Sequence, residues 1–164
     1  MPLFRDGECE PLRRWHEAAQ IIGFAACALL ANLIIGLIIK PLGFPGAKEV
    51  NQGLIELHGE FFAFFMIVID APFTETIYIQ WMPLLVSKIA RRTPIVQILW
   101  AACWCSLMHI PHGMASILQN FGVGWILASC FLFCRKEEWL KAYRVTSIAH
   151  AIHNLTIYII SHSM

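Results

Sequence analysis

A long apolar run, Ala18–Ile39, constrains the fold of this chain more than any other feature of its sequence. The run contains no charged side chain. At about 1.5 Å per residue, a helix of this length crosses the roughly 30 Å hydrocarbon core of a bilayer. Over the whole chain, 58% of the 164 residues are apolar and only 14% are charged, whereas soluble domains average about 45–50% and about 25%. The sequence therefore predicts an integral membrane protein.

Five further apolar segments follow this run, with polar residues or Pro and Gly between them. They are Leu57–Asp70, Pro72–Ser87, Pro94–Ile110, Met114–Cys134 and Val145–Ser161. We therefore predict an all-α fold, a polytopic membrane helix bundle of about six hydrophobic segments. It forms a single domain over residues 1–164, with a polar N-terminal segment at 1–17. The two segments that meet at Ala71-Pro72 are short for a bilayer, so we expect a broken pair of helices there.

Charge and cysteine content narrow the class of protein further. The net charge is only +1, so nothing indicates nucleic-acid binding. The cysteines form no Cys-x-x-Cys pair, and we interpret them as small core or lipid-facing residues rather than disulfide or zinc-ribbon ligands. They are Cys9, Cys27, Cys103, Cys105, Cys130 and Cys134.

Four polar residues lie where a membrane helix does not normally carry them: Glu75, His109, His150 and Asn154. Ionisable groups inside membrane segments are costly and usually mark function. A carboxyl group in such a place can act as a general base, although a neutral Glu75 that hydrogen-bonds to another helix would have the same signature. His150 and Asn154 are spaced i,i+4, so both can donate to an oxyanion from one helix face. Together these groups suit a hydrolytic site.

The residues and their order resemble the CPBP (Abi) family, which includes CAAX proteases and bacteriocin-processing proteins. The three motifs of that family read approximately AP-x-x-EE-x-x-x-R, F-x-x-x-H and H-x-x-x-N. The corresponding stretches here are Ala71-Pro72-x-x-Glu75-Thr76-x-x-x-Gln80, Cys105-x-x-x-His109 and His150-x-x-x-Asn154. The gaps between the motifs are also similar, and the resemblance covers the core from residue 57 to residue 158.

The first motif departs from the family pattern at two positions. Thr76 stands where the family has a second acid, and Gln80 stands where it has an arginine. An acid and an arginine at i,i+4 form an ion pair, and losing both charges together avoids leaving one of them unpaired in the bilayer. We expect Thr76 and Gln80 to support the site through a neutral hydrogen bond, with Glu75 as the catalytic residue.

The resemblance implies a glutamate-dependent intramembrane protease. Glu75 and His109 would activate a water molecule for attack on a peptide carbonyl, and His150 with Asn154 would stabilise the oxyanion. Neither an acyl-enzyme nor a cofactor is implied. The implied substrate is a membrane-anchored peptide or protein, such as a prenylated tail, a leader or a sorting signal, taken from the lipid bilayer. We expect a multi-pass protein of a cell membrane, the bacterial inner membrane.

Two alternatives remain open at the level of the sequence. Two His-x-x-His pairs have spacings compatible with metal binding, so a zinc-dependent hydrolase is one of them. Its ligands would be drawn from Glu75, His109, His150 and His153. In the other, a non-catalytic binding or immunity protein uses the same polar groups to recognise a peptide or to hold helices together.

Overall fold

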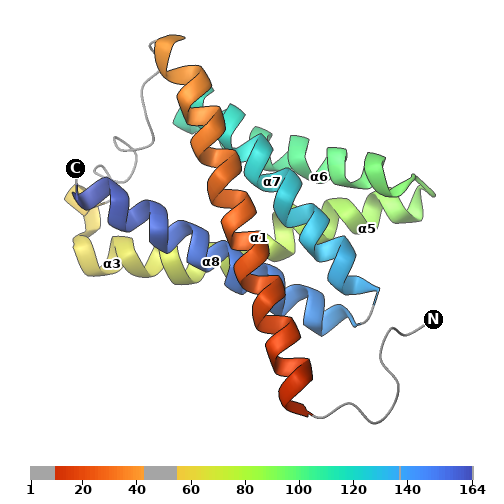
Figure 1. Cartoon of the computed structure of the whole chain (residues 1–164). Helices are drawn as coiled ribbons and strands as arrows, with labels where there is room; N and C mark the ends of the chain where they lie inside the picture. The colour runs from red at the N-terminus through yellow and green to blue at the C-terminus, as the bar shows by residue number, and fades with distance from the viewer. Residues whose placement is uncertain (1–9, 43–54, 137, 164) are drawn as a thin grey trace.

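The computed structural model describes residues 10–42, 55–136 and 138–163, and all regular structure within those ranges is helical (Figure 1). The helices, in chain order, are α1 (Glu10–Ile39), η1 (Lys40–Leu42), α3 (Glu60–Phe64), η2 (Phe65–Asp70), α4 (Ala71–Glu75), η3 (Thr76–Trp81), α5 (Met82–Ile89), α6 (Pro94–Met108), η4 (Ile110–His112), α7 (Met114–Arg135) and α8 (Trp139–Ser163). η1 and η4 are 3-10 helices, whereas η2 and η3 are π-helices. The all-α class is confirmed for these residues.

In the described part of the chain, three helical segments are long and apolar enough to cross a membrane, which supports the assignment to the membrane proteins. They are Arg14–Leu42, Glu60–Ile89 and Met114–Arg135. α6 is also apolar but is shorter than these segments. The predicted total of about six hydrophobic segments therefore stays a prediction.

The expected break at Ala71-Pro72 is wrong, because one helical segment continues through it from Glu60 to Ile89. The backbone at Asp70, just before this dipeptide, has φ −65° and ψ −52°, which are helical values. The two short segments predicted on either side of Pro72 are thus two halves of one long element.

A π-helix explains how this element accommodates Pro72. A proline ring collides with the carbonyl group four residues earlier and supplies no N–H donor. In η2, just before the proline, the N–H of Ala71 donates to the carbonyl of Met66, five residues back rather than four. The wider turn gives the ring room and lets the helix continue. The same arrangement, η3, precedes Pro83.

Two helices begin earlier than their predicted apolar segments. α8 starts at Trp139 rather than Val145, because the buried Ala142 adds a turn that packs into the core although basic residues flank it. α1 starts at Glu10, so helical structure enters the segment 1–17 that was predicted as polar. Residues 1–9, including Cys9, lie outside the described part of the chain.

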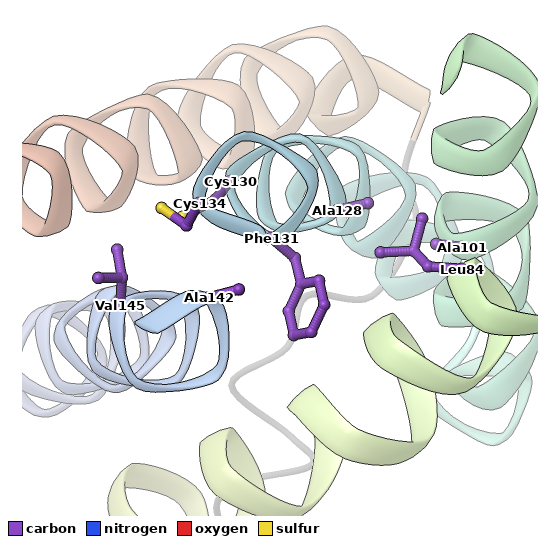
Figure 2. Packing of buried hydrophobic residues seen from close by; sticks show 8 residues of the cluster. All are labelled: Leu84, Ala101, Ala128, Cys130, Phe131, Cys134, Ala142 and Val145. Atoms are coloured by element: carbon purple, nitrogen blue, oxygen red, sulfur yellow. The ribbon is translucent and has the colours of Figure 1, made fainter. Parts of the chain in front are cut away.

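The core lies where α5, α6, α7 and α8 meet (Figure 2). Phe131 of α7 is its largest fully buried side chain. Around it stand mostly small residues, which allow the helices to approach one another closely; they are Leu84, Ala101, Ala128, Cys130, Cys134, Ala142 and Val145. The five cysteines in the described residues are free thiols, some buried and some exposed, as expected of core or lipid-facing side chains.

Gly124 of α7 marks the closest approach to α6. A Cβ atom there would lie 2.7 Å from the Cβ of Cys105 and 3.3 Å from the Cα of Ala102, and a rotamer change moves neither atom. We therefore expect Gly124→Ala to lower the free energy of unfolding by about 1–3 kcal/mol through overpacking. Thermal unfolding of the purified protein in detergent measures this loss.

The matched control is Gly23→Ala in α1, where an added Cβ would meet no heavy atom within 4 Å. This change is expected to be neutral or to stabilise, by about 0.5–1 kcal/mol, because alanine favours a helix more than glycine does. A melting temperature that is unchanged in Gly124→Ala would contradict the close contact of α6 with α7.

Candidate functional site

Glu75 and His150 form the centre of the candidate site. Glu75 is the last residue of α4, near the middle of the long segment Glu60–Ile89, and 29% of its side chain is exposed. His150 lies on α8, which packs against α4 and both π-helices. Its Nε2 atom is 3.8 Å from Oε2 of Glu75, which is longer than a direct hydrogen bond. The structure thus brings together two of the four residues that were predicted to be catalytic.

His109 follows α6, and its ring is oriented by its own helix. Nδ1 of His109 is 2.8 Å from the carbonyl oxygen of Cys105. A carbonyl oxygen only accepts, so Nδ1 carries the proton and Nε2 keeps a basic lone pair. His109 lies close enough to His150 for a charge on one ring to act on the other. The third predicted residue is therefore near one member of the pair.

Asn154, the fourth predicted residue, has other partners. Its Nδ2 donates to the carbonyl oxygen of Ile67, in η2, at 2.9 Å. Its Oδ1 lies 3.0 Å from Nδ1 of His153. The amide of Asn154 therefore links α8 to η2, rather than standing free beside His150 as an oxyanion donor.

His153 is not directed to a common centre with the other proposed zinc ligands. Its Nδ1 faces Asn154, and its Nε2 lies 3.2 Å from Nδ2 of Asn32, in α1. Within residues 10–42, 55–136 and 138–163, no three His, Cys, Asp or Glu side chains converge closely enough to hold a metal ion. The zinc alternative stays a prediction, which metal removal tests.

The predicted hydrogen bond between Thr76 and Gln80 is replaced by a bond to the backbone. The hydroxyl of Thr76 is fully buried and donates to the carbonyl oxygen of Pro72 at 2.6 Å. Gln80 is 2% exposed, and its Oε1 has no hydrogen-bond partner among the residues that the structure describes. Both residues follow Glu75 on the same helical segment, but they do not pair with each other.

Sequence reasoning missed Asn32 and the carbonyl group of Ile67. Asn32 is the only strongly polar residue between Gln20 and Lys40, and an isolated Asn in an apolar span signals a hydrogen bond to another helix. The carbonyl of Ile67 lacks a partner in its own helix because the π-helix pairs Ala71 with Met66 and the next residue, Pro72, has no N–H. A regular α-helix would instead leave the carbonyl of Val68 unpaired, so the sequence alone does not indicate Ile67.

No family model, curated protein or solved structure matches this chain. The family resemblance therefore rests on the motif residues.

Proposed function

We propose that this protein is an intramembrane endopeptidase that cleaves a membrane-associated peptide or protein with a water molecule activated by Glu75. The observation that supports the proposal most is the approach of Glu75 Oε2 to His150 Nε2 at 3.8 Å, between two different helices. A carboxylate and an imidazole at this distance, in a mostly apolar bundle, can both contact one water molecule. The motif order that resembles the CPBP (Abi) family points to the same chemistry.

In the proposed reaction, the oxygen of the water bonds to the scissile carbonyl carbon, and Glu75 accepts one proton of that water. The lone pair on Nε2 of His109 accepts a hydrogen bond from the same water and orients it. The C–N bond then breaks, and the proton passes from Glu75 to the leaving nitrogen. A carboxylic acid and an amine result, with one water consumed and no bond formed to the protein.

We assign to His150 the stabilisation of the negative charge that develops on the carbonyl oxygen. It is 7% exposed, and its Nδ1 has no hydrogen-bond partner among the described residues. Because Nδ1 is itself buried, the nitrogen that can donate to an oxyanion beside Glu75 is Nε2, which faces Glu75 at 3.8 Å and gives up no direct hydrogen bond to do so. Asn154 is less suited to this role, because its amide already donates to Ile67.

An exposed apolar stripe supports entry of the substrate from the lipid. Four large apolar side chains at i,i+4 spacing lie exposed along one segment and end two residues before Glu75; they are Phe61, Phe65, Ile69 and Phe73. Such a stripe suits lipid contact and a membrane-anchored substrate. We propose further that it is a multi-pass protein of a cell membrane, the bacterial inner membrane in particular.

The test is cleavage of a panel of membrane-anchored peptide reporters by the purified protein in liposomes, with and without a strong chelator. Cleavage that persists with the chelator and requires Glu75 supports the proposal. Cleavage that is lost on chelation and restored by zinc would replace it with the metal-dependent alternative. Reporter binding without cleavage, unaffected by loss of Glu75, would favour the non-catalytic binding protein.

A further inference from the structure

We propose that Asn32, His153 and Asn154 form a hydrogen-bond relay that joins α1, α8 and η2 and so positions His150 against Glu75. This inference rests on the proposed function for its kinetic consequences, but not for its structural ones. Asn32 and His153 act in it as positioning residues, since neither contacts Glu75.

Each hydrogen bond in the relay fixes which atom donates and which accepts in the next bond. Nδ2 of Asn154 donates to the Ile67 carbonyl at 2.9 Å, so the other end of the amide, Oδ1, is the acceptor that faces His153. Nδ1 of His153 must then carry the proton, and its Nε2 must accept. Nδ2 of Asn32 supplies the donor for Nε2 at 3.2 Å. Every bond in the chain therefore runs from donor to acceptor in one direction, from α1 to η2.

The relay ends on a carbonyl that the helix itself cannot satisfy. In η2, the N–H of Ala71 bonds to Met66, and the next residue, Pro72, has no N–H to offer Ile67. An unpaired carbonyl in an apolar bundle is costly, and a side-chain amide from a neighbouring helix removes that cost. Pro72 thus creates the acceptor on which Asn154 anchors α8.

The start of the relay is equally constrained. Asn32 is half-buried on α1, and His153 is 5% exposed, so both polar groups need partners inside the bundle. Asn32 and His153 are each other's hydrogen-bond partners, across the contact of α1 with α8. The relay therefore fixes how α8 is rotated about its own axis relative to α1 and η2.

This rotation decides where His150 points. His150 precedes His153 and Asn154 by three and four residues, so all three lie on one side of α8. The ring centroids of His150 and His153 are 6.4 Å apart. Within the described ranges, Nδ1 of His150 has no hydrogen-bond partner that would orient the ring. Rotation of α8 away from the relay would carry His150 away from Glu75.

The structural test is nitrogen NMR of the full-length protein in lipid bilayers, with ¹⁵N-labelled histidine. In the wild type, the His153 resonances, identified by their loss in His153→Gln, are expected to show a protonated Nδ1 and an unprotonated Nε2. In Asn32→Asp, the carboxylate only accepts, so a proton should move onto Nε2 of His153. The matched change Asn120→Asp, at an amide bonded within α7 to Ser116, should leave His153 unchanged.

The positioning test uses Asn32→Leu, with Asn120→Leu as its control. Asn32→Leu is expected to shift the His150 resonances and to lower kcat for reporter cleavage about tenfold or more, with KM within about twofold, because misplacing a catalytic group affects the chemical step. Asn120→Leu should change neither quantity.

The outcomes separate the relay from the proposed function. A wild-type His153 protonated on Nε2 alone would overturn the relay, whatever the activity. Unchanged His150 resonances and kcat in Asn32→Leu would overturn the positioning role. If the wild type cleaves no reporter, the proposed function fails, while the tautomer of His153 and the His150 shifts still support or overturn the relay.

Discussion

Replacing Glu75 with glutamine is expected to lower kcat/KM for cleavage of a membrane-anchored reporter by at least about 100-fold, the smallest loss typical for a general base. Glutamine keeps the shape and a hydrogen-bonding oxygen of the side chain but cannot accept the proton of the water. Because Glu75 is only partly buried and has no direct hydrogen bond to His150, the exchange should leave the fold intact. Initial rates of reporter cleavage in liposomes measure the loss, and thermal unfolding checks the fold.

Glu60→Gln provides the control for this prediction. Glu60 begins α3 on the same helical segment and is exposed, so the same chemical change there should alter kcat/KM by less than about twofold, since it touches no group that takes part in the reaction. If Glu75→Gln cleaved the reporter as fast as Glu60→Gln, the glutamate mechanism would be excluded.

The second large effect is expected from Phe131→Ala in the core. Phe131 is fully buried where α7 meets α5, α6 and α8 (Figure 2). Truncation leaves a cavity that surrounding small residues cannot fill. We expect a loss of about 3 kcal/mol in the free energy of unfolding, at the low end of such truncations in soluble cores, because detergent also solvates the ring in the unfolded state. Equilibrium unfolding in mixed micelles measures it.

Phe61→Ala is the matched control, because the ring of Phe61 is 84% exposed on α3. The same atoms are removed there without creating a cavity, so the free energy of unfolding should change by no more than about 0.5 kcal/mol. Equal losses in the two variants would mean that α7 is not packed as the structure has it.

Two neutral residues, Thr76 and Gln80, follow Glu75 at the positions where the first motif of the family has charged residues. Thr76 is satisfied by its own helix through Pro72, whereas Gln80 keeps a buried acceptor without a partner. Neither Thr76 nor Gln80 is ionisable, so neither competes with Glu75 for a proton. Both positions thus differ from the family pattern, which has an acid and an arginine there.

Much of the fold follows from the sequence. The apolar runs predict the helical class. Pro94 and Met114 begin α6 and α7 as predicted, because a proline at the first position and Gly113 before the second favour helix ends from local backbone preferences alone. The helix through Pro72 was missed, because a proline predicts a break unless a π-helix relieves it. The start of α8 was missed for a different reason, since its packing against the core outweighs the polar residues of its first turns.

The sequence by itself determined that this is an apolar, helical chain with Glu75, His109 and His150 in its helical segments and the loop between them, because side-chain chemistry and the helical period are local properties. Only the tertiary structure decided that Glu75 meets His150, and that Asn154 takes the Ile67 carbonyl instead of joining them. The physical reason is that the helical repeat of about 3.6 residues per turn fixes which residues share a face of one helix. How two helices are rotated and cross depends on contacts between side chains far apart in the sequence, such as Asn32 with His153.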